Sequence, residues 1–184
     1  GGPGTGKTTL LGLFLMSLKA LYPTMEVALC APTGKAAERM KESVNDVYES
    51  FTTHRMLGSA PGGGFSYNKD NPLPFRLIVA DESSMYDVAL MYALCQAIDD
   101  GCALLIVGDT DQLPSIGAGA VLNDLIASEL FGVSRLTQIH RQAALSKIIT
   151  NAHAINNGRP QDLQVGGDFS LVRRDTSEEG HQAR

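Results

Sequence analysis

The chain begins with an eight-residue segment that restricts its fold more than any other feature. Residues 1–8, GGPGTGKT, fill every fixed position of the pattern G-x-x-x-x-G-K-[ST]. Its glycines let backbone N–H groups curl around a phosphate, and a helix that follows adds the positive end of its dipole. A chance glycine-rich turn before a helix is the alternative, and the complete match argues against it. The segment therefore predicts a phosphate-binding loop.

The loop residues receive separate expected roles. Lys7 is expected to reach the β- and γ-phosphates of a nucleotide, and Thr8 to hold Mg²⁺ through its hydroxyl. The implied cofactors are ATP and Mg²⁺. The expected nucleotide-binding residues are Gly1, Gly2, Pro3, Gly4, Thr5, Gly6, Lys7, Thr8 and Thr9.

Short apolar runs alternate with helical patterns along the chain. Strands are predicted over 27–31, 77–80 and 103–107, each of which ends at a polar or glycine-containing turn. Helices are predicted over 8–21, 36–48, 88–98, 120–127 and 146–156, a loop or hairpin over 59–74, and a further strand over 169–172. The alternation predicts a three-layer α/β domain with a mainly parallel sheet, which binds ligands at the carboxyl ends of its strands.

Two acidic residues end the second predicted strand. Asp81 is expected to bind Mg²⁺ through water, and Glu82 to polarise a water that attacks a phosphate. Alone this pair is a weak signal, because acidic residues often begin turns or cap helices, as we expect of Asp87. Together with the phosphate-binding loop, the pair predicts nucleoside triphosphate hydrolysis.

Four more segments follow the loop in a specific order. They are APTGKAA at 31–37, DESSM at 81–85, GDTDQLPS at 108–115 and QIHRQ at 138–142. With the loop, this set resembles motifs I, Ia, II, III and IV of the superfamily 1B helicases, closest to the RecD-like branch that includes the helicase subunit of exonuclease V. The resemblance implies a RecA-like P-loop NTPase domain, helicase lobe 1A, over 1–158. Residues 159–184 would then be a linker and the start of a second, truncated lobe.

The resemblance also implies roles for two further residues. Gln112 resembles the glutamine that senses the γ-phosphate or its attacking water, since an amide both donates and accepts. Arg141 resembles the arginine that stabilises charge on the γ-phosphate. Without the resemblance, Gln112 would be a polar turn residue and Arg141 a surface residue in a salt bridge. The expected catalytic set is Lys7, Asp81, Glu82, Gln112 and Arg141.

Two segments resemble DNA-facing parts of the same family. The first is 32–35, and the second is TTHRMLG at 52–58. The residues expected to contact DNA are Pro32, Thr33, Gly34, Lys35, Thr53 and His54. An N–H group, a hydroxyl and an ammonium at one helix start suit a phosphate, and an imidazole can stack on a base. The alternatives stay open: a plain strand-to-helix turn with Thr33 as cap, and capping or packing for His54.

Composition limits how such a chain would hold DNA. The net charge is −5, whereas proteins that bind mainly through phosphates carry a basic footprint. DNA must therefore be held locally, or with help from another domain. No stretch is apolar enough for a membrane span, and the three cysteines form no C-x-x-C pair, which indicates reduced core thiols in a cytoplasmic protein.

The implied function is a motor enzyme that couples ATP hydrolysis to 5′-to-3′ movement along single-stranded DNA, with recombinational repair as the setting by analogy. Expected partners are single-stranded DNA, a second RecA-like lobe of the same parent chain and RecB/RecC-like subunits, with no membrane. The alternatives are the helicase part of a conjugative relaxase and a nucleotide-binding scaffold. Because the loop starts at Gly1, without the strand that should precede it, we expect a piece of a longer protein that alone binds ATP weakly and hydrolyses it negligibly.

Overall fold

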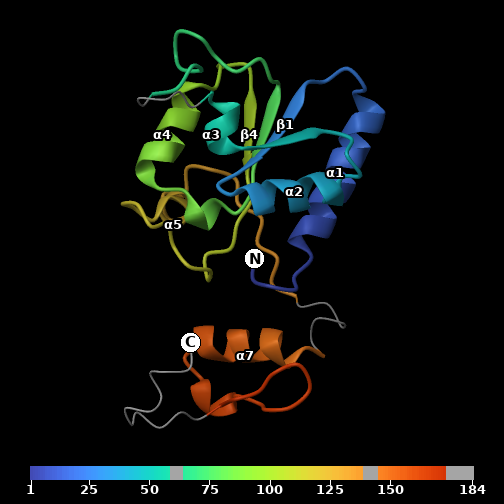
Figure 1. The fold of residues 1–184 in the computed structure, drawn as a ribbon, viewed down its shortest axis with the longest axis vertical. Helices are drawn as coiled ribbons and strands as arrows, with labels where there is room; N and C mark the ends of the chain where they lie inside the picture. The colour runs from blue at the N-terminus through green and yellow to red at the C-terminus, as the bar shows by residue number, and fades with distance from the viewer. Residues whose placement is uncertain (59–63, 139–144, 173–184) are drawn as a thin grey trace, which may run out of the picture. The chain divides into compact units, whose positions relative to one another are not determined.

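The computed structural model describes residues 1–58, 64–138 and 145–172, which fall into two compact units, Gly1–Gln138 and Ile139–Arg184. A four-stranded sheet with the order β2-β1-β3-β4 organises the first unit (Figure 1). Its strands are β1 (Val27–Ala31), β2 (Glu49–Thr52), β3 (Leu77–Ala80) and β4 (Ala103–Ile106). All three strand pairings are parallel, so the predicted α/β fold with a parallel sheet is confirmed.

Helices cover both faces of this sheet. One face carries α1 (Lys7–Leu21) and α2 (Gly34–Ser43), and the other carries α3 (Thr53–Met56) and α4 (Val88–Gln96) (Figure 1). A short 3₁₀ turn, η1 (Ser83–Met85), follows β3, and α5 (Val121–Ala127) follows β4. The second unit contains α7 (Lys147–Asn156) and the 3₁₀ turn η2 (Pro160–Asp162).

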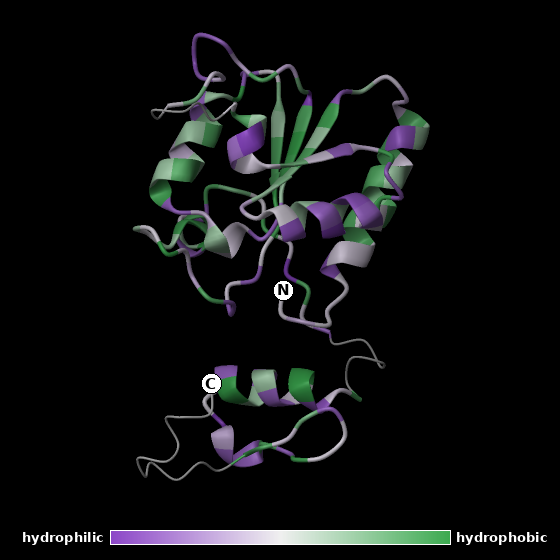
Figure 2. Ribbon diagram, in the orientation of Figure 1, coloured by the Kyte–Doolittle hydropathy of each residue, from purple (hydrophilic) through white to green (hydrophobic). Residues whose placement is uncertain are grey.

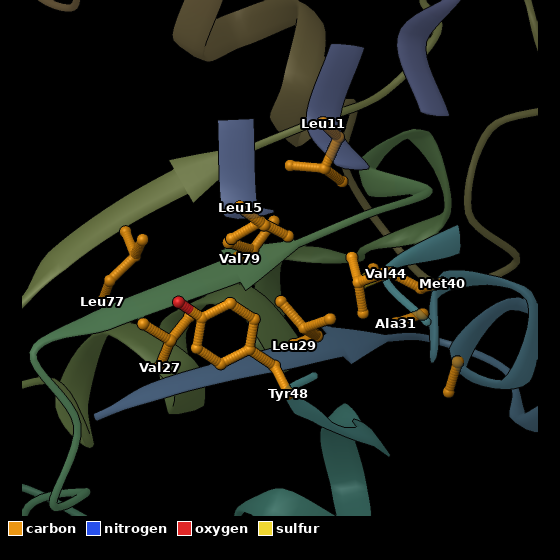
Figure 3. Packing of buried hydrophobic residues seen from close by; sticks show 11 residues of the cluster. Leu11, Leu15, Val27, Leu29, Ala31, Met40, Val44, Tyr48, Leu77 and Val79 are labelled. Atoms are coloured by element: carbon orange, nitrogen blue, oxygen red, sulfur yellow. The ribbon is translucent and has the colours of Figure 1, made fainter. Parts of the chain in front are cut away.

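Alternation along the strands produces two hydrophobic cores. Successive side chains of a strand point to opposite faces, so β1 and β3 contribute to both cores and are buried along their whole length. Figure 3 shows the first core, where Leu11 and Leu15 of α1 lie over Leu29 and Val79 of the sheet. The second core, under α3 and α4, includes Ala28, Cys30, Ile78, Ala80, Tyr86 and Leu94.

The hydropathy of the ribbon follows this layering (Figure 2). Green, apolar strands lie in the middle, and purple, polar segments occur on α2 and α3. Among the described residues, no helix has the length and apolar character that a membrane span requires. All three cysteines are free: Cys30 is buried and Cys102 partly so, but Cys95 is exposed, so the expectation of core thiols is wrong for Cys95.

The helix predicted over 36–48 is wrong in its second half. It starts at Gly34 and ends at Ser43, because Asn45 and Asp46 take left-handed φ values of 50° and 57° that a helix cannot continue. The strand β2 then begins at Glu49. It lies at the edge of the sheet and its residues are exposed or half-buried, so it lacks the apolar run that marks a buried strand.

The other predicted boundaries are close to the observed ones. The runs over 27–31 and 77–80 are strands as predicted, and the third strand ends at Ile106. Asp87 caps α4 as expected, since its Oδ1 accepts a hydrogen bond of 2.8 Å from the backbone N–H of Leu90. The strand predicted over 169–172 is wrong, because Phe169 forms only an isolated bridge with Gly166. The loop at 59–74 contains the isolated bridge of Asn68 with Asn71, and its residues 59–63 lie outside the described part.

We predict that the close packing of α1 on α2 requires a glycine at position 12. A Cβ there would lie 2.8 Å from the backbone oxygen of Ser43. Gly12→Ala should therefore destabilise the chain by about 1–3 kcal/mol in urea unfolding, although alanine favours helix by about 1 kcal/mol. Gly34→Ala is the matched control, because a Cβ at Gly34 meets no atom within 4 Å. A Gly12→Ala chain as stable as the parent would contradict this account of the helix pair.

Candidate nucleotide-binding site

The glycine-rich loop turns tightly into the start of α1. Gly4 and Gly6 have left-handed φ values of 75° and 83°, which explains why glycine occupies these positions. The Thr5 side chain is buried, and its hydroxyl donates to the backbone oxygen of Gly2 at 2.8 Å. Gly6 is the N-terminal cap of α1, so the positive end of the helix dipole lies at the loop.

The ammonium of Lys7 is surrounded by oxygen atoms. It donates to the backbone oxygens of Gly1 and Gly2, the latter at 3.0 Å, and it lies 3.4 Å from Oδ2 of Asp109. An ammonium with several oxygen partners at a helix start fits the phosphate oxygens of a nucleotide, which would replace the two carbonyl contacts. The loop is thus closed on its own lysine, and the residue types fit an anionic ligand.

Asp109 is a site residue that the sequence analysis did not select. Its side chain is only 1% exposed, and its Oδ1 accepts a hydrogen bond of 3.1 Å from the backbone N–H of Asp111. The signal was present in the sequence, because Asp109 is a charged residue placed just after an apolar strand run. Its pairing with Lys7, 102 residues away in the chain, appears only in three dimensions.

Asp81 and Glu82 follow β3 at the same edge of the sheet. Burial raises the pKa of Asp81, although the backbone N–H of Glu82 donates to its Oδ1 at 2.8 Å and Lys7 lies near enough to oppose the shift. Burial and the charge of Asp81 raise the pKa of Glu82, again opposed by Lys7. Glu82 has a left-handed φ of 51°, a strained backbone that often occurs at functional sites. Lys7, Asp81, Glu82 and Asp109 therefore form one group of interacting charges.

The remaining predicted nucleotide residues lie around this group to different degrees. Thr8 and Thr9 are exposed in the first turn of α1. Gln112 is exposed on the loop after β4, where its backbone N–H donates to the oxygen of Asp109 at 3.3 Å. Its side chain borders a hollow of about 20 Å³ that Ser84 also lines. Arg141 lies outside the described residues, so its role stays a prediction.

The first of the expected DNA-facing segments connects β1 to α2. Thr33 is the N-terminal cap of α2, and its hydroxyl accepts a hydrogen bond of 3.3 Å from the backbone N–H of Ala36. Pro32 is half-buried, whereas Gly34 and Lys35 are exposed. The structure therefore bears out the capping role of Thr33 and leaves Gly34 and Lys35 accessible to a ligand.

The second segment divides into a buried and an exposed residue. Thr53 has no exposed surface, and its hydroxyl bonds to the backbone oxygen of Ala31 and to the hydroxyl of Tyr86. Because its side chain has no exposed surface, it cannot reach DNA from this position, and we correct its expected role to a structural one. His54 is exposed, and its ring packs against Phe65 with 5.9 Å between the ring centroids.

Comparison with known proteins finds one matching domain family and relatives that are named as DNA helicases. The family described as AAA domain matches residues 1–118. The chain is 44% identical over 184 residues to the ATP-dependent RecD2 DNA helicase of Deinococcus radiodurans, covering 100% of this chain and 24% of that protein. It is 40% identical over 182 residues to the RecBCD enzyme subunit RecD of Mycobacterium tuberculosis, covering 86% of this chain and 31% of that subunit. The chain thus spans less than a third of either relative.

Solved structures share the fold. The crystal structure of Bacteroides sp Pif1 in complex with ADP-AlF4 matches with a TM-score of 0.52 and 22% identity, over 86% of this chain and 41% of that one. The HK97 bacteriophage large terminase matches with a TM-score of 0.50 and 12% identity, over 88% of this chain and 44% of that one. At these identities the likeness concerns the fold alone.

We predict that the acidic pair lowers the stability of the folded chain at neutral pH. Because the pKa of Glu82 is raised on folding, its carboxyl favours the folded state when protonated, and this stability is lost as the pH rises through the raised pKa. Glu82→Gln should therefore raise the melting temperature by a few degrees at neutral pH. The difference should vanish below the ordinary glutamate pKa of about 4.3.

Thermal unfolding followed by circular dichroism across this pH range measures the effect. Glu38→Gln, at an exposed position of α2, is the control and should change the melting temperature less. A Glu82→Gln chain that is less stable than the parent at neutral pH would show that Glu82 is held by favourable contacts instead.

Proposed function

The chain belongs to the AAA domain family and is a RecD-like member of the superfamily 1 helicases, and on this premise we propose that it is the ATP-binding motor domain of a DNA helicase. In this proposal, ATP hydrolysis drives 5′-to-3′ movement along single-stranded DNA. The proposal rests on one observation. The side chains of Lys7, Asp81, Glu82 and Asp109 lie together at the carboxyl ends of β3 and β4.

Each charged group has a distinct task in the proposed hydrolysis. Lys7 exchanges the carbonyl oxygens of its own loop for phosphate oxygens of ATP and stabilises the charge that develops during transfer. Glu82 accepts a proton from the attacking water, and its raised pKa makes it a stronger base than an exposed glutamate. Gln112 and Arg141 are proposed to contact the γ-phosphate side.

The donor set also fits a magnesium ion. The hydroxyl of Thr8 and the carboxylate of Asp81 are oxygen ligands of the kind that Mg²⁺ prefers. When bound, Mg²⁺ would neutralise charge on the phosphate oxygens. Asp81 is suited to this task because its carboxylate lies partly buried at the end of β3 and forms no ion pair with another described residue.

DNA would be held at the neighbouring ends of β1 and β2. Backbone N–H groups at Gly34, the ammonium of Lys35 and the exposed ring of His54 offer contacts to phosphates and bases. Movement requires a second RecA-like lobe, which we propose lies in the same longer chain, since such motors open and close around ATP between two lobes. RecB/RecC-like subunits, in the cytoplasm, are the proposed further partners.

We predict that two substitutions separate binding from hydrolysis in the full-length protein. Lys7→Ala should reduce ATP turnover by about 10²-fold or more and weaken nucleotide binding, because it removes charge from the transferring phosphoryl group. Glu82→Gln should reduce turnover by about 10²–10⁴-fold while binding is kept. Phosphate release and titration with a fluorescent ATP analogue measure the two effects.

Lys19→Ala provides the control, because Lys19 lies on the same helix and its ammonium donates to the backbone oxygen of Pro23 at 2.8 Å. Its turnover should match that of the parent. Equal loss of nucleotide binding in Lys7→Ala and Glu82→Gln would mean that the two roles are assigned incorrectly.

We predict that a methyl group at Gly34 interferes with DNA and not with folding. A Cβ at this position meets no protein atom within 4 Å, so only an approaching ligand can collide with it. Gly34→Ala and Lys35→Ala should each weaken binding of a labelled oligothymidylate several-fold in fluorescence anisotropy. Lys35→Ala should also lower the slope of log affinity against log salt by about 1.

Lys41→Ala is the matched control for charge on the same helix. Lys41 lies in the last turn of α2 and pairs with Asp46 at 3.5 Å. Its removal should leave DNA affinity within about twofold, the scale of a weak, screened surface charge. Equal effects of the Lys35 and Lys41 substitutions would remove the support for a DNA contact at the start of α2.

A further inference from the structure

A chain of three buried polar side chains crosses the second hydrophobic core. Cys30, Thr53 and Tyr86 have no exposed surface. The hydroxyl of Tyr86 contacts the hydroxyl of Thr53 and lies 3.6 Å from the sulfur of Cys30, and Thr53 donates to the backbone oxygen of Ala31 at 3.2 Å. Buried polar groups of this kind fix one arrangement of the segments that carry them, because any other arrangement leaves them without partners.

The direction of these hydrogen bonds follows from the number of protons available. A hydroxyl carries one proton, and Thr53 uses it toward Ala31. Thr53 must then accept from Tyr86, which leaves the oxygen of Tyr86 to accept from the thiol of Cys30. Burial raises the pKa of Cys30 to about 11 and also raises the pKa of Tyr86, so both groups keep their protons at neutral pH. All the hydrogen bonds of this series therefore run in one direction, from the donor Cys30 to the acceptor Ala31.

Two members of this hydrogen-bonded series lie next to segments with a proposed task. Ala31 directly precedes the segment 32–35, and Thr53 directly precedes His54. Tyr86 directly follows the η1 turn, and the turn follows Asp81 and Glu82. The hydroxyl of Tyr86 is thus linked to both proposed DNA-binding segments, while its backbone continues from the proposed hydrolytic carboxylates.

The η1 turn is short, and hydrogen bonds hold it in place, so a displacement at one of its ends reaches the other. The hydroxyl of Ser83 donates to the oxygen of Ala80 at 2.8 Å, and the N–H of Ser83 donates to Val107 at 3.0 Å. The N–H of Tyr86 donates to the oxygen of Ser83 at 3.3 Å. Asp87 is also fixed, as the cap of α4. A displacement of Glu82 is therefore passed on to Tyr86 with little loss.

We propose that Tyr86 is a positioning residue that couples the state of the nucleotide site to the placement of the two DNA-binding segments. The proposal rests on the proposed function, and it gives the hydroxyl a task that the ring alone cannot perform. Phenylalanine would fill the same space in the core, yet it could not hold Thr53 and Cys30 in a defined register. The coupling free energy between two sites is reciprocal, so it can be measured as the effect of nucleotide on DNA affinity.

The experiment uses the full-length protein with Tyr86→Phe, and Tyr48→Phe as the matched control. Tyr48 is also buried, and its hydroxyl has no hydrogen-bond partner in the described part of the chain. Affinity for an oligothymidylate is measured with and without a non-hydrolysable ATP analogue, together with ATP turnover with and without DNA. The ratio of the two DNA affinities is the coupling, and a loss of stability alone does not change it below the melting temperature.

Tyr86→Phe should keep the turnover and the KM for ATP measured without DNA within about twofold. Its affinity ratio should move toward one, and the DNA concentration for half-maximal stimulation should rise by about tenfold, within the range usual for coupled sites. Tyr48→Phe should behave as the parent. Thr53→Ser, which retains the hydroxyl, should preserve the coupling, whereas Thr53→Val should lose it and add little to the effect of Tyr86→Phe.

The outcomes separate the two levels of the argument. A parent protein whose turnover does not respond to DNA overturns the proposed function, and the coupling role of Tyr86 with it. A parent that responds, with Tyr86→Phe showing the same affinity ratio, overturns the coupling role alone. Additive losses in the Thr53→Val and Tyr86→Phe double variant would likewise show that the two hydroxyls do not act as one chain.

Discussion

The ion pair between Lys7 and Asp109 holds the carboxyl edge of the sheet together. It joins the first turn of α1 to Asp109, three residues past the end of β4, two points 102 residues apart. Asp109 is 1% exposed, and a carboxylate buried to this degree without a cation would cost several kcal/mol. The ammonium is therefore required by the fold itself. In the proposed function the same ammonium binds a nucleotide phosphate, so folding and substrate binding would depend on one charge.

The strand order explains how one edge of the sheet can serve two ligands. In the order β2-β1-β3-β4, the ends of β3 and β4 carry Asp81, Glu82 and Asp109, while the ends of β1 and β2 lead into the two segments proposed to bind DNA. All strands are parallel, so these ends lie side by side along one edge. The two halves of this edge meet between β1, which carries Cys30, and β3, which precedes Tyr86. A signal between the two ligands needs to cross only this junction.

Sequence reasoning reached the features that depend on local pattern. The strands β1 and β3 are fully buried, so their residues form apolar runs that are visible in the sequence. The phosphate-binding loop matches a sequence pattern with fixed positions. The strand β2 escaped because an edge strand that is half exposed has no such run, and because the left-handed turn at Asn45 and Asp46 interrupts a helical pattern. The contacts of Asp109 and Thr53 join residues far apart in sequence, so no pattern of spacing could reveal them.

The net charge is −5, and the charged side chains differ between the two halves of the carboxyl edge of the sheet. Near β3 and β4, the carboxylates of Asp81, Glu82 and Asp109 lie close to the ammonium of Lys7, so this half is acidic. Near β1 and β2, the exposed side chains include Lys35, His54 and Arg55. Charges in salt solution act over about 8 Å, so each half presents its own potential to a ligand. In the proposed function, a DNA strand is attracted to the half with Lys35, His54 and Arg55 and repelled by the acidic half. Triphosphate would then enter the acidic half together with its metal ion, so that the two polyanions would not compete for one basic surface.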